Sequence, residues 1–121
     1  SYTPACAVFL QKVFPDRFEL VAGPSNETVP RYAREHLAAP LCDLVYIDGG
    51  HEVSEATDDL LYMSLLAARG RTLVVMDDIG CEASYCEGPQ VAWQAFQAAG
   101  RLRELGCMSE GHRRWCWGLY L

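Results

Sequence analysis

Two polar segments of this sequence each follow an apolar run, and their residue types could do chemistry together. Residues 48–51 read DGGH after one run, and the pair Asp77 and Asp78 follows another. Carboxylates gathered in one crevice repel each other, and a hard divalent cation resolves this because it prefers carboxylate oxygens. We therefore expect Asp48, Asp77 and Asp78 to bind Mg²⁺ or another divalent cation.

His51 stands three residues after Asp48 and is placed to reach the same crevice. An imidazole titrates near neutral pH, which suits a general base, so His51 is the candidate catalytic residue. Gly49 and Gly50 would let the backbone turn sharply and approach a ligand closely. Plainer interpretations are that a strand-end aspartate caps a helix or bonds a loop, and that a lone loop histidine faces solvent. The joint arrangement of the four side chains favours chemistry.

The two acidic segments can meet only if the apolar runs before them are neighbouring strands. Residues 72–76 are apolar and β-branched almost throughout, which predicts a strand at the centre of a sheet. Further strands are predicted at 18–22 and 43–47, and helices at 3–15, 26–37, 52–69 and 88–99. This alternation indicates parallel strands, and ligands bind such sheets beyond the carboxyl ends of the strands.

The last two predicted strands differ from the others. Residues 103–108 and 115–121 are separated only by the short polar segment 109–114, which predicts an antiparallel hairpin. A chain of 121 residues can bury one core. We therefore predict a single α/β domain over residues 1–121, with a mostly parallel sheet that ends in an antiparallel hairpin.

The composition disfavours several classes of partner. Half of the residues are apolar and 21% are charged, which is the balance of a folded protein. The formal net charge of −6 disfavours nucleic acid and anionic membrane surfaces. The apolar runs are too short to span a bilayer, and residues 1–10 lack the basic start of a secretory signal. We expect no nucleic-acid partner and no membrane partner.

The six cysteines bear on the compartment. They could form three disulfides, but most lie in apolar segments, as buried free thiols do. We therefore expect free thiols and an intracellular, cytoplasmic protein. Cys81 and Cys86 could also bind zinc, although the usual two-residue spacing and a second pair are missing, which favours structural or incidental thiols.

The sequence resembles class I, Rossmann-type S-adenosylmethionine-dependent methyltransferases. The resemblance rests on YIDGGH at 46–51, LVVMDD at 73–78 and the helix that opens with Gly88-Pro89, and it extends from FPDRFELVAG at 14–23 to GPQVAWQAFQAAGRL at 88–102. The sequence is most similar to the metal-dependent branch of this family, which methylates hydroxyls of sugars and natural products. The resemblance implies a three-layer α/β/α fold, S-adenosylmethionine as cofactor and a small-molecule hydroxyl as substrate.

The site residues implied by this resemblance can be assigned one by one. Asp48, Asp77 and Asp78 correspond to the Mg²⁺ ligands, and His51 corresponds to the residue that takes the substrate proton. The residues expected to contact the cofactor are Gly23, Ser25 and Asp48.

The chain departs from the family on its N-terminal side. Its glycines contain no G-x-G spacing, so the cofactor-binding loop and its strands are missing. Family members usually carry Gly-Asp-Ser where this chain has Gly23-Pro24-Ser25. Missing strands would expose a sheet edge, which favours a homo-oligomer or a partner chain that supplies them. A truncated sequence, a split protein and a degenerate scaffold domain all stay open.

Three functions compete at this point. The leading hypothesis is metal-assisted O-methylation of a small-molecule hydroxyl with S-adenosylmethionine. The second is a catalytically inactive, methyltransferase-like interaction or scaffold domain, which the absent glycine loop and Pro24 favour. The third is another metal-dependent α/β enzyme, such as a hydrolase that uses the same carboxylates, which activity without S-adenosylmethionine would favour.

Overall fold

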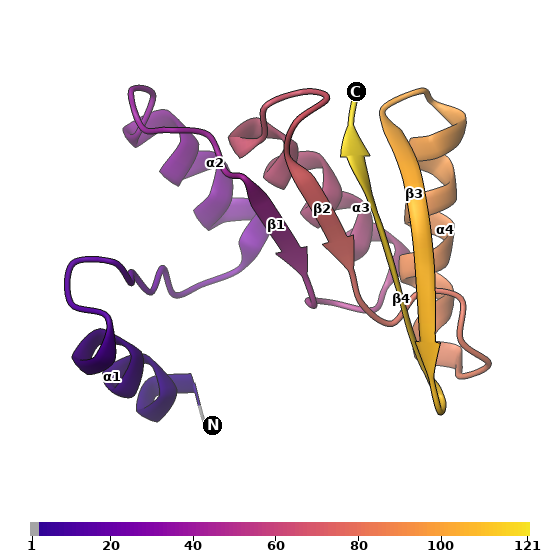
Figure 1. The fold of residues 1–121 in the computed structure, drawn as a ribbon, viewed down its shortest axis with the longest axis horizontal. Helices are drawn as coiled ribbons and strands as arrows, with labels where there is room; N and C mark the ends of the chain where they lie inside the picture. The colour runs from indigo at the N-terminus through magenta and orange to yellow at the C-terminus, as the bar shows by residue number, and fades with distance from the viewer. Residues whose placement is uncertain (1–2) are drawn as a thin grey trace.

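Helices and strands alternate along most of the chain in the computed structural model, which describes residues 3–121 (Figure 1). In chain order the elements are α1 (Thr3–Val13), α2 (Ser25–Glu35), β1 (Leu44–Ile47), α3 (Val53–Met63), the 3₁₀ helix η1 (Ser64–Leu66), β2 (Leu73–Met76), the 3₁₀ helix η2 (Ser84–Cys86), α4 (Glu87–Ala98), β3 (Leu102–Glu110) and β4 (Arg113–Tyr120). All of the predicted helices are present, but the helix predicted at 52–69 ends at Met63 and is followed by the 3₁₀ helix η1. Within the described part, no helix is long and apolar enough to cross a membrane.

The four strands form one sheet in the order β1-β2-β4-β3. β1 and β2 are parallel, with Leu44 opposite Leu73 and Ile47 opposite Met76. β4 runs antiparallel to β2 and to β3, so the predicted hairpin is confirmed. β2 lies between β1 and β4, which confirms the inner position expected for it. The sheet is not mostly parallel, however, because one strand pair is parallel and two are antiparallel.

The prediction of a strand at residues 18–22 is wrong. These residues lie outside the sheet, and Leu20 and Val21 are 45% and 38% exposed. A strand needs a neighbouring backbone to bond with, and among residues 3–121 no strand lies beside the outer edge of β1. The apolar pattern of the segment reports a preference for extended backbone and cannot supply a partner.

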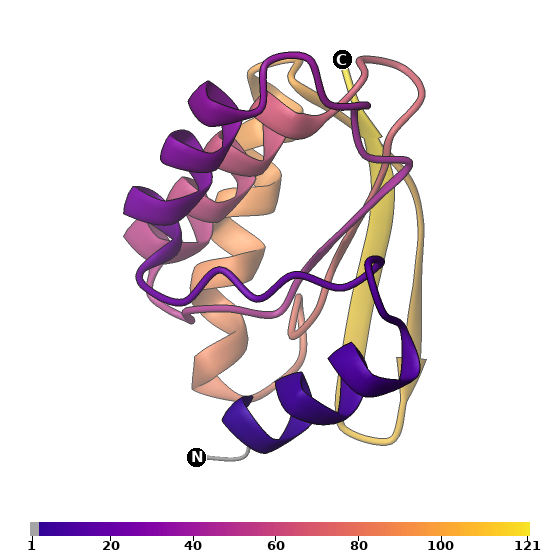
Figure 2. The ribbon, with the colours of Figure 1, turned by 90° about the vertical axis from the view of Figure 1, so that its left-hand side faces the viewer.

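Helices cover one face of the sheet. Figure 2 shows α2, α3 and α4 on the same side of the strands, while α1 lies apart from this layer (Figure 1). The structure thus shows two layers in the described residues, where three were predicted. The core lies between the two layers, where Leu60 of α3, Val74 of β2 and Trp93 of α4 are at most 1% exposed.

The first turn of α4 packs against the backbone that carries the candidate base. A Cβ at Gly88 would lie 1.9 Å from the carbonyl oxygen of His51 and 2.8 Å from the carbonyl carbon of Glu52. Both atoms belong to the backbone, so no side-chain rotation could make room for a methyl group there. This contact holds the backbone of His51 against α4.

We expect Gly88→Ala to destabilise the fold by about 1–3 kcal/mol, because overpacking against a backbone forces the chain to shift. Urea unfolding followed by circular dichroism measures this change. Gln94→Ala, on the exposed side of the same helix, is the matched control and should change stability by less than about 0.5 kcal/mol. Equal stability of Gly88→Ala and the parent would contradict the packing.

Candidate functional site at the carboxyl ends of β1 and β2

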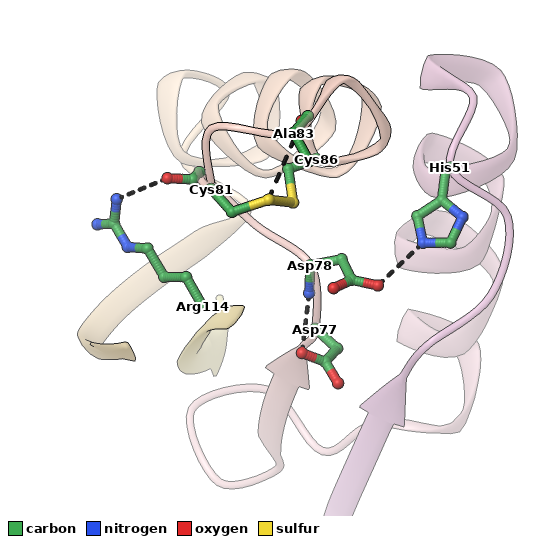
Figure 3. The surroundings of a disulfide bond; sticks show 8 residues. His51, Asp77, Asp78, Cys81, Ala83, Cys86 and Arg114 are labelled. Carbon is green, nitrogen blue, oxygen red and sulfur yellow. Dashed lines mark hydrogen bonds and ion pairs between the residues drawn. A yellow bond between two sulfur atoms is a disulfide. The ribbon is translucent and has the colours of Figure 1, made fainter. Parts of the chain in front are cut away.

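The parallel register of β1 and β2 brings the two acidic segments to one edge of the sheet. The backbone N–H of Asp77, one residue past the end of β2, donates a 3.0 Å hydrogen bond to the carbonyl oxygen of Ile47 at the end of β1. In Figure 3, His51, Asp77 and Asp78 lie together at this end of the strands. The two segments therefore meet, as their positions in the sequence predicted.

His51 and Asp78 form a direct pair. His51 Nε2 lies 3.0 Å from Asp78 Oδ2, and the two side chains are 43% and 20% exposed. An ionised carboxylate can only accept a hydrogen bond, so Nε2 carries the proton and Nδ1 is the ring nitrogen that can take another. Asp78 has a φ of 51°, a conformation that is uncommon outside glycine. In this conformation the carboxylate of Asp78 lies within hydrogen-bonding distance of the imidazole.

Tyr46 holds Asp77, the other aspartate of the pair, in place. Its hydroxyl donates a 2.7 Å hydrogen bond to Asp77 Oδ2. This bond is the largest cause that raises the pKa of Tyr46 to about 12, followed by burial and by the negative charges of Asp77, Asp48 and Asp78. The negative charges of all three predicted metal ligands thus disfavour ionisation of the Tyr46 hydroxyl. The sequence did not single out Tyr46, because nothing in an alternating strand shows which polar group its hydroxyl meets.

The three carboxylates match a hard cation in chemistry, since their oxygens are the donors that Mg²⁺ prefers. In this structure, however, their oxygen atoms do not all lie within 4.8 Å of one another. Within residues 3–121, the set of three ligand-type side chains whose donor atoms lie within 4.8 Å of one another is Glu104, Cys107 and Cys116. The two sulfurs of that set are bonded to each other, which removes them as thiolate ligands. A shared ion at the carboxylates would require their side chains to turn toward each other, and their role as ligands stays a prediction.

The residues expected to contact the cofactor do not all lie together. Gly23, with a φ of 133°, and Ser25 line a cavity of about 370 Å³ beside α2 and α3. Ser25 Oγ donates a hydrogen bond to Asp59 Oδ1 of α3, which ties the start of α2 to its neighbour. Asp48 is exposed and is not part of that lining. The cofactor role of these three residues stays a prediction.

Tyr85 is a side chain near His51 that the sequence did not reveal. Its ring stands edge-on to the imidazole, with 5.4 Å between ring centroids and an angle of 70° between the planes. The two side chains line one cavity of about 530 Å³ together with Glu87 and Gly88 at the start of α4. Tyr85 sits between Cys81 and Cys86, and that position is the one sequence signal that could have drawn attention to it.

The expectation of free thiols is wrong for four of the six cysteines. Two disulfides are present, Cys81–Cys86 and Cys107–Cys116, while Cys6 and Cys42 are free. The first pair is joined because η2 folds the loop back on itself, and the second because its members face each other in the register of the hairpin. The expectation of an intracellular, cytoplasmic protein rested on free thiols and therefore loses its basis. The Cys81–Cys86 bond closes the loop that follows Asp78 (Figure 3).

Comparison with known proteins shows a likeness of fold. No family model and no curated protein matches the chain. Among solved structures it is similar to the apo structure of CalS11, a TDP-rhamnose 3'-O-methyltransferase in calicheamicin biosynthesis, with a TM-score of 0.60 and 20% sequence identity. The alignment covers 80% of this chain and 40% of that one. This chain therefore shares part of the fold of that structure and spans less than half of its length.

The hydrogen bond between Tyr46 and Asp77 predicts that the stability of the fold depends on pH. The pKa of Tyr46 is raised from 10.0 to about 12 in the folded state. The contribution of its neutral hydroxyl to the stability of the fold is therefore fully present below pH 10 and is lost as the pH rises through 12. The absorbance of tyrosinate, taken as the difference between the parent and Tyr46→Phe, measures this ionisation. Asp77→Asn should move the transition toward pH 10, because it removes the largest cause of the shift. An unmoved transition in Asp77→Asn would show that the bond does not govern this pKa.

The loop disulfide predicts a loss of stability when it is removed. Cys81→Ser should lower the free energy of unfolding by about 2 kcal/mol, the loop-closure entropy of such a short loop. Urea unfolding without reductant measures it. Cys6→Ser, which replaces an exposed free cysteine, is the control and should match the parent. A Cys81→Ser variant as stable as Cys6→Ser would argue against a closed loop.

Proposed function

We propose that this chain forms part of an S-adenosylmethionine-dependent methyltransferase that methylates a hydroxyl of a small molecule with the help of a divalent cation. The observation that carries the proposal is the 3.0 Å pair of His51 and Asp78 at the carboxyl ends of two parallel strands. Ligands of open α/β sheets bind at these ends. The methyltransferase-like fold supports the reaction type, and the resemblance at residues 46–51 and 73–78 supports a hydroxyl as the acceptor.

In this proposal His51 is the general base. A hydroxyl must lose its proton to become a competent nucleophile. With Nε2 bonded to Asp78, Nδ1 is the nitrogen that takes this proton. Asp78 is a positioning residue, because it orients the imidazole and stabilises the positive charge that proton uptake creates.

The remaining predicted residues would hold the groups that react or assist. S-adenosylmethionine supplies a methyl group on a positively charged sulfur, and Gly23, Ser25 and Asp48 would form part of its site. A cation such as Mg²⁺ supplies a positive charge that favours ionisation of a nearby hydroxyl, and Asp48, Asp77 and Asp78 would hold it. Tyr46 would keep Asp77 in place through its hydrogen bond.

A second candidate is a catalytically inactive interaction domain. One observation favours it: among the described residues, β1 pairs with β2 on one side and with no strand on the other. Leu44 and Tyr46 on this edge strand are 55% and 53% exposed. An open edge is a template for another strand, so a second copy or a partner chain could complete the sheet. This candidate predicts a stable complex and no cofactor binding.

Transfer of a radiolabelled methyl group from S-adenosylmethionine to a panel of small hydroxyl compounds tests the leading proposal. His51→Ala should lower kcat by about 10²–10⁴, the usual effect of a lost general base. Removal of divalent cations by a chelator should also suppress transfer.

The control variant is His36→Ala, since His36 bonds the carbonyl of Tyr32 within α2 and takes no part in the proposed site. It should retain the activity of the parent. Equal kcat for His51→Ala and His36→Ala would remove His51 from the mechanism. Failure of the folded protein to bind S-adenosylmethionine, together with co-purification of a second chain, would favour the interaction domain.

A further inference from the structure

The β3–β4 hairpin brings together three side chains that can bind a metal ion. Glu104, Cys107 and Cys116 each place one ligand atom within 4.8 Å of the others. In the structure the two cysteines form a disulfide, which occupies both sulfurs. Reduction of that bond would leave two thiols and a carboxylate around one point. Two thiolates and a carboxylate are donors that Zn²⁺ takes in proteins.

A β-bulge in β3 puts Glu104 on the same face of the hairpin as the cysteines. Side chains alternate along a regular strand, so residues three apart point to opposite faces. Here the register shifts just after Glu104, which lies opposite Gly118. Cys107 lies opposite Cys116, which is two residues from Gly118 and shares its face of β4. The extra residue, Leu105, therefore turns the carboxylate to the side of the two sulfurs.

Trp93 holds the carboxylate of Glu104 in place. It belongs to α4, the helix packed against β3 (Figure 1), and is 1% exposed. Its indole Nε1–H donates a 2.8 Å hydrogen bond to Glu104 Oε2. A carboxylate has two oxygens with about four acceptor sites, so Glu104 can keep this bond and still bind an ion. Such hydrogen bonds commonly orient the carboxylates that ligate metals. Because Glu104 is exposed, an ion can reach it from solvent.

We propose that the reduced hairpin binds Zn²⁺ through Glu104, Cys107 and Cys116, with water as the fourth ligand, and that the disulfide form does not bind it. Zn²⁺ takes four ligands in tetrahedral geometry, and thiolates favour it over harder ions such as Mg²⁺. The pairing of β3 with β4 extends past Cys107 in both directions, so the two sulfurs stay near each other once their bond is broken. The site does not depend on the proposed methyl transfer.

A dithiol can reduce this disulfide, and the two cysteines differ in their access to it. Cys107 is half-buried, whereas Cys116 is 2% exposed. A thiolate of the dithiol attacks Cys107 Sγ, the S–S bond breaks, and Cys116 leaves as a thiolate that takes up a proton. The second thiolate of the reductant attacks the mixed disulfide and releases Cys107, so the reductant leaves as a cyclic disulfide after giving two electrons. Zn²⁺ then displaces one proton from each thiol.

Titration with Co²⁺, a coloured substitute for Zn²⁺, tests the proposal. The protein is reduced with a dithiol, separated from it by gel filtration without oxygen, and checked for folding by circular dichroism. The reduced protein should develop a thiolate-to-cobalt charge-transfer band, and Zn²⁺ should remove the band by displacing the cobalt. The disulfide form should develop no band, because both sulfurs are already bonded.

Two variants remove one ligand each. Cys107→Ser should weaken binding by more than about a hundredfold, because the loss of a ligand exceeds the effect of losing a group that orients one. Glu104→Gln retains an oxygen that can accept the Trp93 bond, so it separates ligation from the hydrogen bond. It should weaken binding by about tenfold or more, and it covers the case in which Cys107→Ser fails to fold.

Cys81→Ser and Glu110→Gln are the matched controls. The first removes a thiol of the other disulfide, and the second removes an exposed carboxylate of the same strand. Both should bind cobalt as the reduced parent does. Binding lost in Cys81→Ser but kept in Cys107→Ser, or unchanged in Glu104→Gln, would overturn the site. A reduced parent that develops no band, or that is unfolded with Zn²⁺ present, would overturn it as well.

Discussion

Four residue pairs join β1 to β2 in parallel, from Leu44 with Leu73 to Ile47 with Met76. Because both strands point the same way, the segments that leave them emerge at one edge of the sheet, and the N–H of Asp77 still reaches the carbonyl of Ile47 there. A slip of one residue would turn every side chain of β1 to the opposite face of the sheet. The contact of His51 with Asp78 and that of Tyr46 with Asp77 both depend on this register.

The segments beyond the strands need support of their own, because loops have no continuous ladder of backbone hydrogen bonds. Support comes from three directions. The first turn of α4 presses Gly88 against the carbonyl of His51, the Cys81–Cys86 bond closes the loop after Asp78, and the backbone of Ile79 bonds that of Arg114. The segments that carry His51 and Asp78 are thus tied to α4, η2 and β4, so each keeps a defined place at an exposed edge.

The charged side chains on the two sides of the loop after Asp78 differ in sign. On one side, the carboxylates of Asp48, Asp77 and Asp78 act together on the hydroxyl of Tyr46. On the other side, the guanidinium of Arg114 donates a hydrogen bond to the carbonyl oxygen of Gly80. The outer edge of β1, which pairs with no strand among the described residues, is the kind of edge onto which another strand can pair.

Local patterns in the sequence determined a large part of this protein. Apolar periodicity and glycine stops located the helices, and the run at 72–76 indicated an inner strand, because these signals depend on residues near one another in the chain. The positions of His51 and Asp78 after apolar runs indicated that these two side chains meet. The tertiary structure alone decided the features that depend on partners distant in the chain. Residues 18–22 have strand composition but no neighbouring strand, and Cys107 bonds Cys116 because the hairpin register places them opposite each other. The hydrogen bonds of Tyr46 with Asp77 and of Arg114 with Gly80 form only because segments distant in the chain fold beside each other.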